Sequence, residues 1–154
     1  MTPIHFQFGD YTVTTDKTIL QPRAIHEWLS VHSYWAMHIP YNSVKTSFDN
    51  SYTIGVLFDG KQVAYARLVT DYSSFAYLAD VYVVQDHRGK GLSKIMMQTL
   101  MDIDWVKNLR RILLATVDAK KLYEQYGFVA PKYPDRLMEI IRPAIYGDDK
   151  NPCS

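Results

Sequence analysis

The sequence predicts a mixed α/β (α+β) domain in which helices flank a mostly antiparallel sheet. One observation behind this prediction is a hairpin pattern, in which the β-forming runs 51–58 and 61–70 flank an Asp59-Gly60 turn. The other is a change of period over 78–103, where strand-like apolar residues give way to apolar residues spaced three and four apart. A strand, a glycine-containing turn and a helix therefore follow one another there.

The remaining elements are predicted from apolar periodicity and from the turn residues that bound each run. Further strands are expected at 5–14, 75–84, 111–116 and 137–141. Helices are expected at 21–32, at about 42–50, at 91–104 and at 119–126. Asn42 or Ser43 is expected to cap the second helix, and Asp118 the last one.

Length and composition narrow the class of protein. The chain has 154 residues, which suits a single domain, placed at 1–145, and a polar tail, placed at 146–154. A formal net charge of +1 argues against nucleic-acid binding through bulk charge. No apolar run approaches the roughly 20 residues of a membrane span. The first residues lack a signal-peptide profile, and the single cysteine, Cys153, has no internal partner, so we expect a cytoplasmic protein.

The turn between the central strand and helix has the composition of a phosphate-binding loop. Gly89 and Gly91 allow a close backbone approach, and the following helix N-terminus presents unpaired N–H groups with a partial positive charge. The spacing does not fit a nucleotide P-loop. A dinucleotide fingerprint is also disfavoured, because Lys94 stands where the third glycine belongs and the motif lies past the middle of the chain.

A third loop pattern fits, and a second motif supports it. Residues 88–93 resemble the Gln/Arg-x-x-Gly-x-Gly/Ala pyrophosphate loop of the GNAT N-acetyltransferase superfamily, with Ser93 in place of the last small residue. Residues 118–128 resemble the same family's A-x-x-L-Y-x-x-x-G-F corner. The resemblance covers roughly 51–141, whereas the first 50 residues match only in their order of elements. The whole chain is similar to small single-domain members.

The resemblance implies direct transfer of an acetyl group from acetyl-CoA to an amine, without a metal. Its coenzyme-binding residues would be the loop residues Arg88, Gly89, Lys90, Gly91, Leu92, Ser93 and Lys94 and the strand residues Val81, Tyr82 and Val83. The pantetheine arm would enter where the strand that ends near Val83 splays from the strand at 111–116. A backbone N–H near Val83 would stabilise the tetrahedral oxyanion.

Two side chains are the catalytic candidates. Tyr123 matches the tyrosine that protonates the departing thiolate in many relatives, and a phenol can donate to a thiolate when it is suitably placed. Asp80, three residues before Val83, is the best candidate for the base that deprotonates the amine. Strand alternation would put Asp80 and Tyr82 on one face. Binding of a cationic substrate and a purely structural role for Asp80 remain open.

The acceptor is not identified by the sequence. Substrate contacts are expected from Tyr34, Trp35, Arg67 and Tyr77. His26 and His32 do not share a helical face, so no metal site is expected. A noncatalytic acyl-CoA sensor and a structural domain with a chance loop are the alternatives. Dimers are common among similar proteins, so a homodimer is left open.

Overall fold

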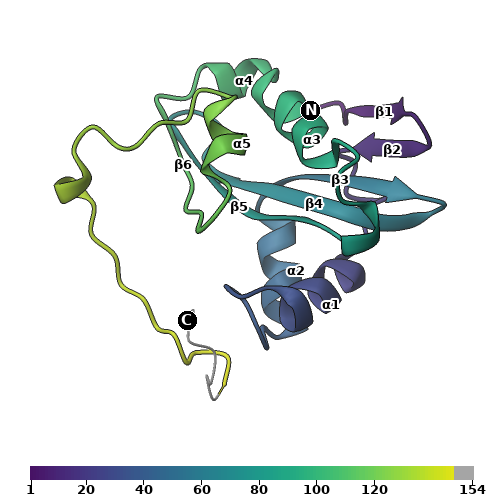
Figure 1. Ribbon diagram of the computed structural model, residues 1–154, viewed down its shortest axis with the longest axis horizontal. Helices are drawn as coiled ribbons and strands as arrows, with labels where there is room; N and C mark the ends of the chain where they lie inside the picture. The colour runs from purple at the N-terminus through teal and green to yellow at the C-terminus, as the bar shows by residue number, and fades with distance from the viewer. Residues whose placement is uncertain (148–154) are drawn as a thin grey trace.

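The computed structural model describes residues 1–147, and a six-stranded sheet forms its centre (Figure 1). The strands follow one another across the sheet in chain order: β1 (His5–Phe8), β2 (Tyr11–Thr14), β3 (Tyr52–Phe58), β4 (Lys61–Thr70), β5 (Phe75–Val83) and β6 (Arg111–Leu113). Neighbouring strands are antiparallel except β5 and β6, which are parallel. The mixed, mostly antiparallel sheet predicted from the sequence is confirmed.

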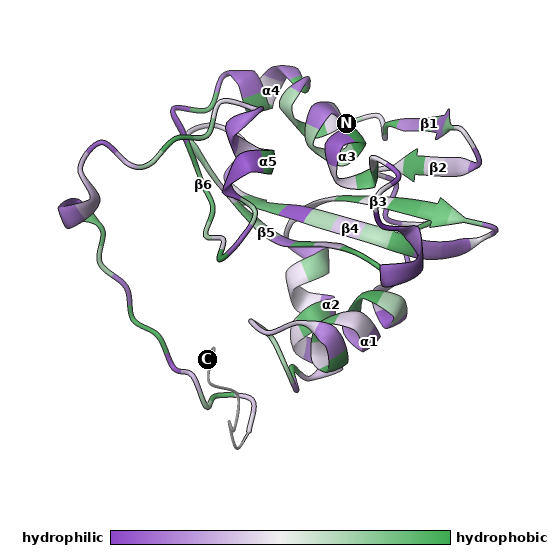
Figure 2. Cartoon of the chain, in the orientation of Figure 1, coloured by the Kyte–Doolittle hydropathy of each residue, from purple (hydrophilic) through white to green (hydrophobic). Residues whose placement is uncertain are grey.

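Helices cover both faces of this sheet (Figure 1). One face carries α1 (Pro22–His32) and α2 (Tyr41–Asp49). The other carries α3 (Leu92–Met101), α4 (Asp104–Lys107) and α5 (Lys120–Glu124). Two short 3-10 helices, η1 (Gln85–His87) and η2 (Pro134–Arg136), lie in connections. The hydropathy colouring of Figure 2 shows hydrophobic residues along β3 and β4, as expected for central strands covered on both sides.

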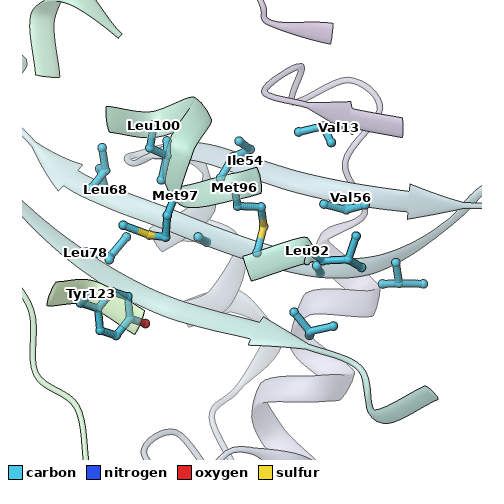
Figure 3. Packing of buried hydrophobic residues seen from close by; sticks show 14 of the residues in the cluster. Val13, Ile54, Val56, Leu68, Leu78, Leu92, Met96, Met97, Leu100 and Tyr123 are labelled. Carbon is cyan, nitrogen blue, oxygen red and sulfur yellow. The ribbon is translucent and has the colours of Figure 1, made fainter. Parts of the chain in front are cut away.

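The main core lies between α3 and the sheet (Figure 3). The α3 residues Leu92, Met96 and Leu100 recur every four positions, so they share one face of the helix and are all buried. The sheet residues beneath them are Val13, Ile54, Val56, Leu68 and Leu78. A second core under α1 and α2 contains Ile25, Leu29, Val44, Phe48, Tyr65 and Tyr82. The predicted helical periodicity therefore describes α3 correctly.

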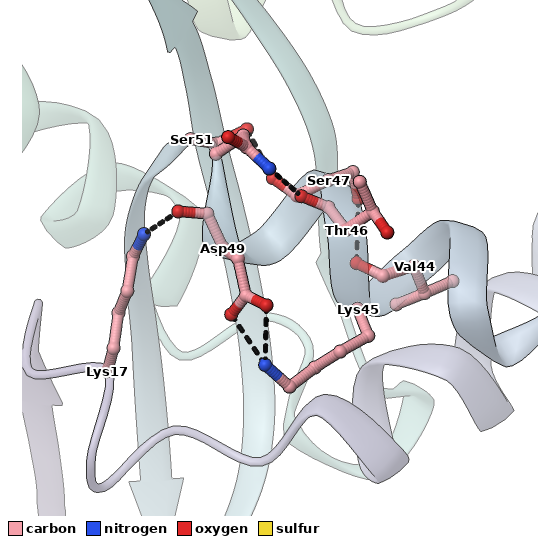
Figure 4. A network of polar contacts seen from close by, with 8 residues as sticks. Lys17, Val44, Lys45, Thr46, Ser47, Asp49 and Ser51 are labelled. Carbon is pink, nitrogen blue, oxygen red and sulfur yellow. Dashed lines mark hydrogen bonds and ion pairs between the residues drawn. The ribbon is translucent and has the colours of Figure 1, made fainter.

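A polar network fastens the end of α2 (Figure 4). Lys45 Nζ lies 2.6 Å from Asp49 Oδ1 one helical turn away, and Lys17 Nζ donates to the Asp49 carbonyl at 2.9 Å. The helix begins at Tyr41 with Pro40 at its N-cap and no side-chain cap. The predicted capping by Asn42 or Ser43 is therefore wrong, because Pro40 already holds the extended geometry that precedes the helix.

Three predicted strands differ from those observed. Residues 5–14 form a hairpin rather than one strand, because Gly9 takes a positive φ of 58° and reverses the chain. The strand expected at 111–116 ends at Leu113. The strand expected at 137–141 does not form among the described residues, where that segment is exposed.

The helical segments also differ in detail. The helix expected at 91–104 divides into α3 and α4, with Ile103 in extended conformation between them. Asp118 does not cap α5, since Ala119 takes the N-cap position and its N–H donates to Thr116 Oγ1 at 3.0 Å. Of the predicted tail at 146–154, residues 148–154, including Cys153, lie outside the described part of the chain.

Two buried tyrosines are expected to make the free energy of unfolding depend on pH. Burial raises the pKa of both Tyr65 and Tyr82 above the ordinary phenol value of 10. A raised folded-state pKa means that the stabilisation is complete below the unfolded pKa and is lost as the pH rises above it. We expect the free energy of unfolding, measured by urea denaturation, to fall above about pH 10 by up to about 1.4 kcal/mol per pH unit for each tyrosine. Tyr65→Phe should reduce that slope, and an unchanged slope would contradict this origin.

Candidate active site

The strands β5 and β6 separate part of the way along their length. Their pairing covers Phe75 with Arg111, Ala76 with Ile112 and Tyr77 with Leu113, three residues on each strand. Strand β5 then continues to Val83, whereas β6 ends. The β6-side edge of residues 78–83 is therefore left without a strand partner in the described chain, and its backbone groups are available to a ligand.

A β-bulge turns the chain within β5. Asp80 and Val81 together lie opposite Ala66 of β4, and Asp80 has a positive φ of 55°. The extra residue shifts the alternation, so Leu78 packs in the core under α3 while Tyr82 packs under α1. Asp80 and Tyr82 lie on the same side, opposite Val81 and Val83, as strand alternation predicts, and the bulge places this side away from that of Leu78.

The end of β5 directs one backbone N–H into the opening. The N–H of Val84 donates to the Val63 carbonyl of β4 at 2.9 Å. Because backbone groups of successive strand residues point to opposite sides, those of Val83 point away from β4. Its carbonyl is found there, accepting from Arg88 Nε at 3.0 Å. The Val83 N–H is therefore directed towards the open side.

The loop after β5 ends in an array of free backbone donors. Gly89 and Gly91 have φ values of 75° and 80°, and Gly91 is the N-cap of α3 without a side-chain cap. Within residues 1–147, no backbone N–H of residues 89–94 donates to a protein acceptor. The next backbone N–H along the chain, that of Ile95, donates to the carbonyl of Gly91. Such an array at a helix N-terminus binds anions.

Two neighbouring cavities open beside these features. The loop cleft, about 640 Å³, is lined by the end of β5, by the loop and by α5. The bulge cleft, about 480 Å³, lies beside the Asp80 bulge and residues 114–118. They share the lining residues Tyr34, Trp35, Val81, Asp118, Ala119 and Tyr123. The shared residues show that the two cavities lie side by side.

Most of the predicted site residues line one of these two cavities. The loop cleft is lined by Val81, Tyr82, Val83, Arg88, Gly89, Gly91, Leu92, Ser93 and Lys94. The bulge cleft contains Tyr34, Trp35, Arg67, Tyr77 and Asp80. Lys90 is exposed and lines neither cavity. The fold thus brings segments together that lie far apart in the sequence, and their individual roles remain predictions.

Tyr123 occupies the junction between the two cavities. Its side chain is 7% exposed and packs at the edge of the core (Figure 3). Burial, and to a smaller extent Tyr34 and Asp118, raises the pKa of the Tyr123 phenol to about 12. The phenol is therefore protonated at neutral pH and has a proton to donate.

Asp80 is the centre of a hydrogen-bonded network. Its Oδ2 lies 2.6 Å from Arg67 Nε, and its Oδ1 accepts from Trp35 Nε1 at 2.8 Å. Arg67 Nη1 in turn donates to Ser51 Oγ at 3.1 Å, and that hydroxyl donates to the Ser47 carbonyl of α2. Figure 4 shows this last link. Both oxygens of the carboxylate therefore hold wall residues of the bulge cleft in place.

Sequence reasoning missed three aromatic residues of the loop cleft, which are Trp28, His32 and His87. Trp28 of α1 stacks on Tyr82 with ring centroids 4.2 Å apart and planes 4° from parallel. Trp28 packs against the core that contains Ile25 and Leu29 of the same helix. His87 also lines the cleft, and its Nδ1 lies 2.9 Å from the Tyr11 hydroxyl. No local sequence motif indicates that these residues line the cleft, because contacts between distant segments place them there.

The described residues show two further properties. Among residues 1–147, no group of three or more His, Cys, Asp or Glu side chains is placed to hold a metal ion. No helix within the same range combines the length and the apolar character needed to cross a membrane.

Comparison with known proteins identifies relatives of this chain. The Acetyltransferase (GNAT) family model matches residues 22–128. A Gibberella zeae protein named as a candidate acetyltransferase is 30% identical over 141 residues, which is 79% of this chain and 80% of that protein. A crystal structure from Xanthomonas campestris, of a candidate acetyltransferase of the GNAT family, has a TM-score of 0.88 at 42% identity. It covers 92% of this chain and 100% of its own.

A more distant structure shares the fold alone. This protein, from Clostridium acetobutylicum, is assigned as an acetyltransferase and was crystallised with acetyl-CoA. It has a TM-score of 0.52 at 17% identity and covers 66% of this chain and 71% of its own. The family match spans both motifs of the active-site candidate, the loop and the α5 corner. The chain therefore belongs to the GNAT family of acetyltransferases.

Proposed function

We propose that the protein is an N-acetyltransferase that moves the acetyl group of acetyl-CoA directly to an amine of a small molecule or peptide. One observation carries the proposal: the unpaired N–H groups of residues 89–94 lie at one end of a cleft whose wall is the open edge of β5. The coenzyme has matching chemistry, since it joins a diphosphate to a long arm with two amides. Family membership supports the same assignment.

The loop and the strand fit the two halves of the coenzyme. The N–H groups of residues 89–94 would bind the diphosphate, and the open backbone of residues 81–83 would bond to the amides of the arm. Arg88 stiffens the junction, because its Nε bonds to the Val83 carbonyl. The coenzyme supplies an activated thioester, and the Val83 N–H would donate to the carbonyl oxygen as negative charge develops on it.

Tyr123 would protonate the departing thiolate. Its pKa of about 12 lies above the roughly 8.5 of an ordinary thiol, so proton transfer between isolated groups would be unfavourable by about 5 kcal/mol. The apolar wall that raises the pKa of the phenol also disfavours a thiolate beside it. The pKa of the thiol therefore rises as well, and the difference between the two pKa values becomes smaller. Tyr123 lines both cavities, which suits a group that acts where the thioester bond between coenzyme and acetyl group breaks.

The role of Asp80 can be tested directly. Its bonds to Arg67 and Trp35 support a positioning role, whereas the prediction of a general base requires a proton to reach one of these occupied oxygens. We expect Asp80→Asn to raise the KM for the amine by about tenfold, because the Arg67 contact weakens, and to leave the pH dependence of kcat unchanged. Loss of the acidic limb of the kcat profile in the variant would instead assign Asp80 as the base.

Two measurements together test the proposed function. Coenzyme A should raise the melting temperature of the protein, and a panel of amines should release free thiol from acetyl-CoA in its presence. A thermal shift without thiol release across polyamines, amino sugars, amino acids and peptides would favour a noncatalytic acyl-CoA sensor. The absence of any shift would favour a structural domain and would reject coenzyme binding.

A further inference from the structure

The bulge cleft contains one carboxylate whose charge no described protein group offsets. Arg67 and Asp80 also line this cavity, but Arg67 Nε lies 2.6 Å from Asp80 Oδ2, so these two charges offset each other. Asp118 is the third charged residue of the lining. Its side chain forms no hydrogen bond or salt bridge within residues 1–147. The lining therefore carries a net negative charge.

Asp118 lies beside the residue that we propose as the acid. Asp118 and Tyr123 both line the loop cleft and the bulge cleft. The Asp118 carboxylate is near enough to contribute to the raised pKa of the Tyr123 phenol. Because Asp118 does not cap α5, its side chain is not tied to the helix. If the thioester is cleaved at Tyr123, a carboxylate at this place faces the nitrogen that attacks it.

Aromatic side chains form a large part of the remaining wall of the bulge cleft. Tyr34, Trp35 and Tyr77 line the cavity and are 37%, 40% and 37% exposed. Trp35 Nε1 donates to Asp80 Oδ1 at 2.8 Å, and its ring meets that of Tyr34 edge to face with centroids 4.9 Å apart. These contacts fix the wall before a ligand arrives. Exposed aromatic faces beside a carboxylate suit a cation that is attached to an apolar body.

We propose that the acceptor is an amine with an apolar body, such as an aromatic ring, and without an anionic group, and that Asp118 binds its ammonium. The inference rests on the proposed acetyl transfer and names the class of acceptor that the same site takes. An anion beside the nitrogen would face Asp118, whereas the positive charge of Arg67 is already offset by Asp80. The cleft therefore selects cations by attraction and rejects free amino acids by repulsion.

The same carboxylate favours the attack of the nitrogen. An amine with a pKa of about 10 is mostly an ammonium at neutral pH, and this is the form that Asp118 attracts. After it has lost one proton, the nitrogen attacks the carbonyl carbon and becomes positive again as the C–N bond forms. It then loses a second proton as the C–S bond breaks. Both protons pass to solvent, to which Asp118 is exposed, while Tyr123 protonates the sulfur and regains its proton from solvent.

Three acceptors that share one ring test the effect of charge. Phenethylamine and phenylalaninamide have no anion, whereas phenylalanine differs from its amide in the carboxylate. In the wild-type protein, kcat/KM for thiol release from acetyl-CoA should be at least about tenfold higher with the amide than with phenylalanine. Asp118→Asn should lower kcat/KM for phenethylamine and the amide by at least about tenfold, mainly through KM, because a charge-assisted contact is lost. It should not lower kcat/KM for phenylalanine.

Glu124→Gln is the matched control for Asp118→Asn. Glu124 is an exposed carboxylate of α5 that lines neither cavity, so the variant loses the same charge outside the cleft. Urea denaturation verifies that both variants are folded. Unchanged kcat/KM in Asp118→Asn, an equal loss for phenylalanine and its amide, or the same effect in Glu124→Gln would remove the binding role from Asp118.

The wild-type protein tests the acceptor class and the proposed function separately. Faster turnover of phenylalanine than of its amide, or of glucosamine than of phenethylamine, would overturn the acceptor class and leave acetyl transfer intact. A protein that coenzyme A stabilises against heat but that releases no thiol with any amine would contradict acetyl transfer, and the acceptor class with it.

Discussion

Replacing Tyr123 by phenylalanine will lower kcat by at least about tenfold while the affinity for coenzyme A changes little. The ring remains, so the core contact of α5 and the shape of both cavities are kept. Only the hydroxyl is lost, and with it the proton for the leaving thiolate. Steady-state kinetics of thiol release, together with calorimetric titration of coenzyme A, measure the two quantities separately.

Tyr126→Phe is the matched control for this experiment. Tyr126 lies three residues further along the chain, and its hydroxyl donates to the Lys94 carbonyl at 3.0 Å, outside both cavities. We expect it to keep most of the turnover. Unchanged kcat in Tyr123→Phe, or an equal loss in both variants, would remove the acid role from Tyr123. Since the pKa of Tyr123 is raised to about 12, its ionisation should produce no loss of activity below about pH 11.

Replacing both loop glycines, Gly89→Ala with Gly91→Ala, is expected to weaken coenzyme A binding by about 100-fold. Both residues have a positive φ, which an alanine adopts only with strain, so the loop will relax and its N–H groups will turn. Loss of two charge-assisted hydrogen bonds to a diphosphate corresponds to roughly 3 kcal/mol, or about two factors of ten in affinity.

A second pair of glycines serves as a control that distinguishes the effect of backbone strain on stability from the loss of contacts to the ligand. Gly9 and Gly60 also have a positive φ, of 58° and 75°, and a Cβ added at either would meet no atom within 4 Å. Both lie in hairpin turns, and neither lines the loop cleft. Gly9→Ala with Gly60→Ala should therefore cost similar stability in urea denaturation but leave coenzyme A affinity unchanged. Equal losses of affinity in the two double variants would show that the loop amides do not bind the diphosphate.

The features predicted correctly from the sequence are those encoded in short windows. The hairpin of β3 and β4 follows from Asp59-Gly60 between β-forming runs, and α3 follows from apolar residues spaced three and four apart. The positive φ of Gly89 and Gly91 also follows from local chemistry. Each of these depends on residues that are neighbours in the chain, so no knowledge of the rest of the fold is needed.

The failed predictions depend on partners that lie far away in the sequence. Residues 137–141 have the pattern of a strand, but a strand also requires a neighbour, and the described chain supplies none. Asp80 is a different case: its place on β5 made it the best candidate for the base, substrate binding and a structural role were left open, and its role stays a prediction. Its bonds to Arg67 and Trp35 could not be predicted, because the bulge in the folded sheet places Asp80 beside these two residues.

By itself, the sequence determined the class of fold and the glycine-containing turn at the start of α3, because turn chemistry and helical period act over a few residues. The resemblance of its local motifs to the family made Tyr123 the candidate acid. Tertiary structure alone decided where β5 and β6 separate, which side chains hold Asp80, and that Trp28 and His87 line the loop cleft. These features arise from packing between segments that are distant along the chain. Their geometry depends on the register and length of strands that no local pattern specifies.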